Sequence, residues 1–163
     1  MTNGRCVLML LENCPYLRDT RVLQEAQALT EAGYRVAVIT ASDGKQPRRA
    51  VVDGVHVYAY RQPSGEGLAG YVFEYGYAMV AALVLALYVW WEHGVDIVHA
   101  HNPPDTFFLI GALFKLAGKR FVFDHHDLAP ELYRVRFGAE RRWVLSLLLW
   151  LERLSCRCAD LVI

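Results

Sequence analysis

The residues best suited to chemistry lie in one short segment, Asp124-His125-His126-Asp127, with Glu131 shortly after it. Imidazole titrates near neutral pH and can donate a hydrogen bond to a substrate hydroxyl or accept one from it. A neighbouring carboxylate such as Asp127 or Glu131 can fix which ring nitrogen carries the proton. We treat all five residues as candidate site residues. The alternative is a loop in which Asp127 only caps the next helix and the histidines take no part.

A second polar segment, His101-Asn102-Pro103-Pro104-Asp105, follows an apolar run. His99 and His101 alternate along this run, and we place them on opposite faces of a strand, with His99 packed inside. His101, Asn102 and Asp105 are candidate substrate-binding residues, although His101 could also have a purely structural role. Two histidines on opposite faces cannot share one ion without a bulge in the strand, and with no convincing ligand set we expect no metal site.

A third polar segment, residues 13–21, follows the first apolar run of the chain. It lacks the GxGxxG pattern of dinucleotide-binding loops, which argues against a dehydrogenase. Asn13, Arg18 and Arg21 are candidate substrate-binding residues, because an arginine near a helix N-terminus can meet an anionic group. The alternative is that both arginines are solvated surface residues.

These polar segments sit between alternating strands and helices. Short apolar runs typical of buried strands occupy Arg5–Leu11, Arg35–Thr40, Val55–Tyr60, Val95–Ala100, Arg120–Asp124 and Asp160–Ile163. Helices are expected after Asp19, over Tyr71–His93 and Thr106–Ala117, from Pro130, and over Glu140–Ala159. The alternation predicts an α/β fold, a Rossmann-like doubly wound parallel sheet. Ligands bind beyond the carboxyl ends of such strands, where the three polar segments should converge.

Composition narrows the class of protein. The chain has 163 residues, enough for one sizeable core, and we interpret residues 1–163 as one domain of a longer protein. Basic and acidic residues both number 17, which gives no support to nucleic-acid binding. The four cysteines have no zinc-like spacing and the N-terminus is no signal peptide, so we expect a reducing, cytoplasmic setting.

Three stretches together resemble glycosyltransferase family 4, and especially its bacterial members that build surface polysaccharides. They are DTRVLQEAQALTEAGYRVAVIT, HAHNPPDTFFLIGALFKLAGKRFVFDHHDLAPELY and LERLSCRCADLVI, and the likeness covers essentially the whole chain. The resemblance implies a GT-B enzyme of two domains, of which this chain is the N-terminal, acceptor-side one. A C-terminal domain, absent from the sequence, would hold most of the nucleotide-sugar donor. Transfer would proceed with retention and without a required metal or other cofactor.

The resemblance also assigns roles to individual residues. His126 falls on the family's histidine that contacts the transferred sugar near its reacting centre, so it is the candidate catalytic residue. His101 and Asn102 match a loop that faces the same cleft. One departure is the first loop, glycine-rich in many members, which here reads Asn13-Cys14-Pro15. Contact between its backbone amides and the donor phosphates is therefore not expected.

Two other functions compete with this interpretation. Asp124-His125-His126 spells the motif of metal-dependent DHH phosphoesterases, but the further Asp-x-Asp of that family is broken at Asp105-Thr106-Phe107. The chain could also be a non-catalytic membrane module, because Tyr71–Trp91 is apolar apart from Glu74 and a membrane span needs about 20 residues. A strand of the sheet follows this segment directly, which favours packing or shallow interfacial contact over spanning.

The sequence further predicts peripheral binding to an anionic membrane at the cytoplasmic face, where a lipid-linked acceptor would be reached. Its basis is the run of Arg134, Arg136, Arg141 and Arg142, the nearby Trp143 and Trp150, and the apolar segment 71–91. The alternative is an ordinary solvated charge run with both tryptophans in the core.

Overall fold

The structure, a computed structural model, describes residues 4–12, 14–42, 44, 47–63, 67–127, 129–137 and 142–163. Its centre is a seven-stranded sheet in the order β3-β4-β2-β1-β5-β6-β7. The strands are β1 (Cys6–Leu10), β2 (Arg35–Ser42), β3 (Arg49–Val52), β4 (Val55–Arg61), β5 (Ile97–His101), β6 (Arg120–Asp124) and β7 (Leu161–Val162). All neighbours run parallel except β3 and β4. The predicted doubly wound α/β fold is confirmed.

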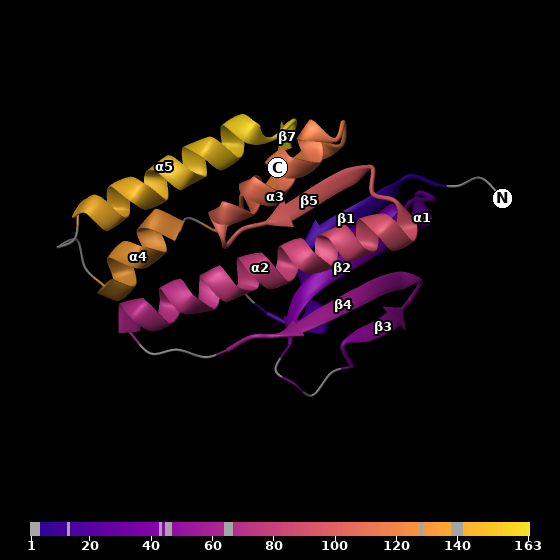
Figure 1. The fold of residues 1–163 in the computed structure, drawn as a ribbon, viewed down its shortest axis with the longest axis horizontal. Coiled ribbons are helices and arrows are strands. Elements are labelled where there is room, and N and C mark those ends of the chain that lie inside the picture. Colours follow the sequence, from indigo (N-terminus) through magenta and orange to yellow (C-terminus); the bar gives the residue numbers. More distant parts are fainter. Residues whose placement is uncertain are drawn as a thin grey trace.

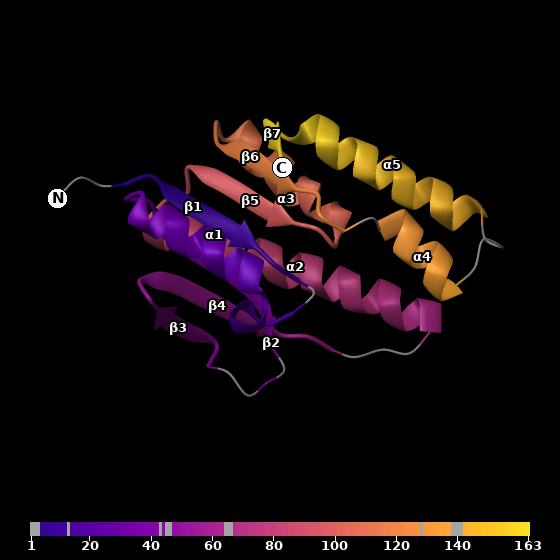
Figure 2. The same ribbon diagram turned by 180° about the vertical axis from the view of Figure 1, so that it is seen from behind.

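Helices cover both faces of the sheet. In Figure 1 the face toward the viewer carries α2 (Gly67–His93), α3 (Phe108–Leu116) and α5 (Arg142–Cys158). Seen from behind in Figure 2, the other face carries α1 (Thr20–Glu31). The first part of α2 extends past the carboxyl ends of the strands, together with α4 (Ala129–Phe137) and the first turns of α5 (Figure 1).

The antiparallel edge strand β3 was not predicted. Asp53 and Gly54, at φ 50° and 84°, form the tight turn of a hairpin between β3 and β4. An Asp-Gly pair favours such a turn, because both residues tolerate positive φ. Its sequence, Arg-Ala-Val-Val, alternates exposed and half-buried residues on a sheet edge, so it carries a weak apolar signal.

The helix expected after Asp19 is formed by α1. Asp19 caps α1 by accepting hydrogen bonds from the backbone N–H groups of Arg21 and Val22, both at 3.1 Å. Gly33 ends the helix at φ 87°. The helix expected from Thr106 begins instead with a 3-10 turn, η2 (Asp105–Phe107), that leads into α3.

Alternate strand residues enter two different cores. Leu8 and Leu10 of β1, with Val98 and Ala100 of β5, pack beneath the helices of the first face. Val7, Met9 and Leu11 pack beneath α1, and Ile97 of β5 lies against them. Every second residue of β5 therefore faces α1, and this alternation decides where its histidines point.

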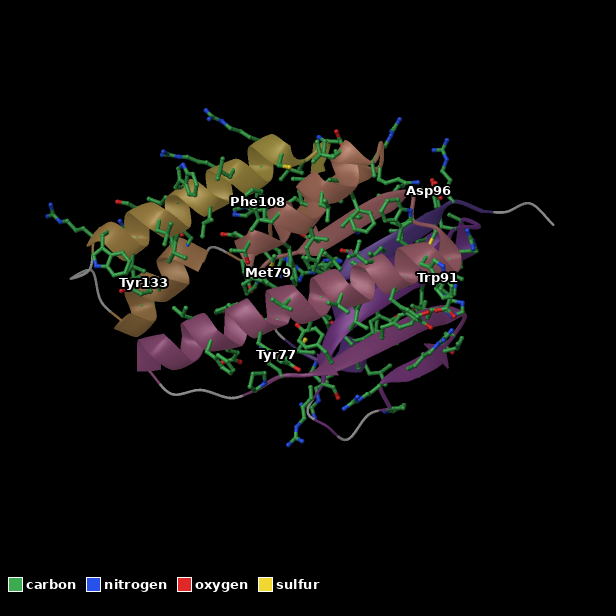
Figure 3. All side chains as sticks on the ribbon, in the orientation of Figure 1. Tyr77, Met79, Trp91, Asp96, Phe108 and Tyr133 are labelled. Carbon is green, nitrogen blue, oxygen red and sulfur yellow. The ribbon has the colours of Figure 1, made fainter. Side chains whose placement is uncertain are left out.

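Helix α2 packs on the sheet along a narrow stripe. Ala78, Ala82, Ala86 and Val89 are fully buried and recur at helical spacing. Most of its other apolar side chains face outward, including Trp91, which is 81% exposed and is labelled in Figure 3. Among the described residues, α2 is the one helix apolar and long enough to cross a membrane, with a mean hydropathy of 1.8. Its contacts with β1, β2 and β4 are those of a crossover helix.

Candidate functional site

Polar side chains gather where β1, β5 and β6 end, as the alternation of strands and helices predicts. The three strands are adjacent and parallel, so the loops that follow them meet at one edge of the sheet. His101 and Asp124 are direct partners in the register of β5 and β6. The last residues of these two neighbouring strands therefore lie next to each other in the site.

The carboxylate of Asp124 is the centre of the site. Its Oδ2 atom accepts hydrogen bonds from Nδ1 of His101 at 2.9 Å and from Nδ1 of His126 at 3.1 Å. Nε of Arg21, from the first turn of α1, lies 3.6 Å from the same oxygen. Asp124 and His101 are buried, while His126 is half-buried. Four predicted site residues thus meet around one oxygen atom.

Burial and charge act in opposite directions on these groups. Burial alone would raise the pKa of Asp124, but the hydrogen bond from His101 and the nearby positive charge of Arg21 outweigh it and lower that pKa. Burial lowers the pKa of His126, with the Asp124 carboxylate opposing the shift. The site therefore holds an ionised Asp124 beside a neutral imidazole at neutral pH. With Nδ1 donating to Asp124, Nε2 of His126 carries a lone pair.

Asn102 organises the loop that carries His126. Its Oδ1 atom accepts hydrogen bonds from the backbone N–H groups of His126 and Asp127, both at 3.0 Å. Its Nδ2 group donates to the backbone carbonyl of Asp127 at 2.5 Å and to the Asp105 carboxylate at 3.3 Å. Asn102 is 1% exposed. Because its amide is fully used inside the protein, Asn102 positions His126 rather than offering a ligand contact of its own.

The placement of His99 and His101 on opposite faces was wrong. Side chains of a strand return to the same face at every second residue, so these two point the same way. Their rings lie 4.4 Å apart between centroids. Both approach Oε2 of Glu25 on α1, at 3.9 Å from Nε2 of His99 and 3.8 Å from Nε2 of His101. The reason given against a shared metal ion therefore fails.

Other predicted site residues lie elsewhere. His125 faces the opposite side of the sheet from His126, with Nε2 3.5 Å from the Glu152 carboxylate. Asp105 is buried among protein groups, and burial raises its pKa. Glu131 is exposed on α4, and Arg18 lies in η1 (Tyr16–Arg18) before α1. The prediction for Asn13 lies outside the described residues.

Sequence reasoning missed Glu25 and a second polar group at the same edge. Glu12, shortly after β1, is 3% exposed, and burial raises its pKa to about 7. Gln62, just after β4, donates from its amide to Glu12 and, at 3.0 Å, to Glu74 of α2. The phenol of Tyr60 is buried next to these groups without a hydrogen-bond partner among the described residues. For Glu12, the position just beyond a strand end was a usable signal.

A Rossmann-like sheet whose polar loops meet at the carboxyl edge defines a ligand-binding α/β domain. The family model described as the glycosyl transferase 4-like domain matches residues 19–163, and the chain belongs to this family. The Asp-His-His sequence that suggested a phosphoesterase is thus part of a glycosyltransferase domain. Its middle residue, His125, points away from Asp124 and His126.

Solved structures with the same fold are GT-B glycosyltransferases, of which this chain corresponds to one domain. Sucrose-phosphate synthase from Thermosynechococcus elongatus has a TM-score of 0.67 at 16% identity, over 97% of this chain and 41% of that chain. UGT2 of Phytolacca americana, in complex with UDP-2-fluoro-glucose and pterostilbene, has a TM-score of 0.62 at 8% identity, over 96% and 47%. MurG of Acinetobacter baumannii has a TM-score of 0.55 at 14% identity, over 98% and 40%. The chain therefore spans less than half the length of each. No curated protein matches the sequence.

Proposed function

We propose that this chain is the acceptor-side domain of an enzyme that transfers a sugar from a nucleotide-sugar donor, with retention, to a lipid-linked saccharide. The product would be a precursor of a bacterial surface polysaccharide. The observation that carries the proposal is the imidazole of His126, held by Asp124 at the open carboxyl edge of a glycosyl transferase 4-like domain. The UDP-2-fluoro-glucose bound in the similar UGT2 structure supports a nucleotide-sugar donor.

His126 is the proposed catalytic residue. Its backbone is held by Asn102 and its Nδ1 by Asp124, so the ring has one defined orientation, with Nε2 3.9 Å from the Asp127 carboxylate. This nitrogen can accept a hydrogen bond from a hydroxyl of the transferred sugar, a contact that contributes to catalysis if it strengthens in the transition state. Arg21, on the other side of Asp124, adds a positive charge where an anionic substrate group would lie.

The donor domain is proposed to lie outside this chain, and transfer is proposed to need no metal or other cofactor. Chemistry between two domains uses contacts from both, so one domain supplies only part of the transition-state stabilisation. The nucleotide sugar acts as co-substrate. The coverage of less than half of each similar structure supports this division.

A peripheral position on an anionic membrane at the cytoplasmic face is part of the same proposal. Trp143 and Trp150 on α5 are 64% and 56% exposed, which contradicts the alternative that both belong to the core. Arg134 on α4 and Arg142 on α5 are also exposed, and Arg141 lies outside the described residues. The apolar outer face of α2 adjoins α3, where Met79 and Leu83 line one apolar pocket with Leu113. Aromatic and basic side chains on one surface suit a headgroup layer.

A transfer assay tests the proposed function. The full-length protein that contains this domain is incubated with a panel of labelled nucleotide sugars and a lipid extract of the source cells. We expect label in the lipid fraction with one donor, retained anomeric configuration by NMR, and unchanged rates after exhaustive chelation. The 163-residue chain alone should transfer nothing. Inversion, loss of activity on chelation, or transfer by the isolated chain would each contradict the corresponding part of the proposal.

A further inference from the structure

We propose that Glu25, His99 and His101 form a binding site for a divalent transition-metal ion of the zinc class, between α1 and β5. The site differs from the chemistry assigned to His126, and it does not depend on the proposed transfer reaction. Three contact atoms converge there: Oε2 of Glu25 and the Nε2 atoms of both histidines. One ligand atom from each of Glu25, His99, His101 and Asp124 lies within 4.8 Å of the other three.

The spacing of these atoms suits a small ion. The Glu25 oxygen lies 3.8 Å from Nε2 of His101 and 3.9 Å from Nε2 of His99. Zinc bonds of about 2.0–2.2 Å in a tetrahedral arrangement separate neighbouring ligands by roughly 3.4 Å. Each of the two Glu25–histidine pairs must therefore close by only a few tenths of an ångström. The Glu25 side chain, 30% exposed on a helix surface, has the freedom to make that adjustment.

Within the described part of the chain, three buried polar atoms of the site lack a hydrogen-bond partner, a place that a bound cation would fill. Nδ1 of His101 donates to Asp124, and its Nε2 atom faces the Glu25 carboxylate at 3.8 Å, beyond hydrogen-bond distance. Oε2 of Glu25 and Nε2 of both histidines are buried and have no hydrogen-bond partner among the described residues. His99 and His101 are 6% and 0% exposed, so bulk water does not supply the missing hydrogen bonds. One bound ion would satisfy all three atoms.

The groups around His101 are those commonly found around a metal-binding histidine. A ligating imidazole usually donates its other N–H to a carboxylate, which orients the ring, and Asp124 does this for His101. Asp124 is itself engaged by His126 and by the Arg21 guanidinium, which leaves Glu25 as the carboxylate ligand. Two imidazoles and one carboxylate favour zinc and related transition metals over Mg²⁺ or Ca²⁺. A zinc ion with three protein ligands commonly takes a water molecule as its fourth.

Zinc binding to the purified protein, expressed without a histidine tag, tests the inference. The protein is stripped with chelator, equilibrated with ZnCl2, freed of excess ion and analysed by mass spectrometry. We expect one zinc ion per chain, a higher Tm with ZnCl2, and visible absorption from Co²⁺ bound by imidazole. Glu25→Gln and His99→Ala should lose all three signals. His56→Ala, which removes a histidine of β4 paired with His93, should keep them.

Circular dichroism identifies any variant that fails to fold. If His99→Ala does not fold, Glu25→Gln still tests the site, because it replaces a half-buried side chain with one of the same shape. No zinc retained by the parent protein would overturn the inference, as would equal retention by Glu25→Gln. Loss of binding in His56→Ala would place the ion elsewhere and also overturn it. None of these measurements uses sugar transfer, so they are independent of the proposed function.

Discussion

Nδ1 of His126 lies 3.1 Å from Oδ2 of Asp124, the residue two positions before it. The same oxygen accepts from His101 of the neighbouring strand at 2.9 Å, so one carboxylate orients two imidazoles. Asn102 holds the backbone of His126 from the other side. A histidine fixed at both its ring and its backbone, at an open edge, is what a contact to one atom of a substrate requires.

His126→Ala in the full-length enzyme should lower kcat by about two orders of magnitude or more, with a smaller effect on KM, because its contact strengthens in the transition state. Steady-state kinetics on the transfer reaction measure this. His56→Ala, a histidine of β4 outside the site, should keep the parent kinetics. Equal losses in the two variants, with both folded, would show that His126 has no special role.

Asn102→Ala should lower stability and kcat together. The change leaves the backbone N–H groups of His126 and Asp127 without their acceptor, at a cost of about 1–3 kcal/mol for each buried group. We expect at least about 2 kcal/mol less free energy of unfolding in urea titrations. KM should change less than kcat, because Asn102 positions His126 without touching the substrate. A variant that kept full stability and lost only substrate affinity would instead make Asn102 a binding residue.

Glu12 should make stability depend on pH. Its folded pKa of about 7 lies above the ordinary value of 4.5, so the folded state holds the proton more tightly than the unfolded state. The stabilisation is fully present below about pH 4.5 and is lost as pH rises through about 7. Its full size is on the order of 3 kcal/mol.

Glu12→Gln has no proton to lose, so its free energy of unfolding should decline less than that of the parent over the same pH range. Urea titrations of both proteins across this range give the difference directly. Parallel curves for the two proteins would mean that Glu12 titrates normally in the folded state. Gln62 should still find an acceptor in the new amide.

The basic surface near α5 should bind anionic membranes reversibly. In flotation assays the protein should rise with anionic liposomes at low salt, stay behind with neutral ones, and be released by high salt, because each arginine near the surface contributes about 1 kcal/mol. Arg142→Glu should weaken binding. Arg120→Glu, at the start of β6 on the opposite edge of the sheet, is the matched control. Equal flotation with both lipids, or release only by detergent, would rule out the electrostatic model.

Much of the fold could be predicted because its signals are local. The apolar runs are buried strands, Asp19 is an N-cap, and Asp53-Gly54 is a hairpin turn, all of which depend on a few adjacent residues. The convergence of polar loops at one edge also followed, because parallel strands end together. The edge strand β3 was missed because its four residues are stabilised by pairing with β4 and hardly by their own burial.

The sequence by itself determined which residues are near the carboxyl edge, and it singled out His126 and the resemblance to a glycosyltransferase family. Only the tertiary structure decided what each polar group does there. Asn102 holds the backbone of His126, His125 lies near Glu152, and Glu25 of α1 lies near His101. The reason is physical: hydrogen bonds and ion pairs act over a few ångströms. Partners far apart in the chain are therefore set by how α1 and the loops pack on the sheet.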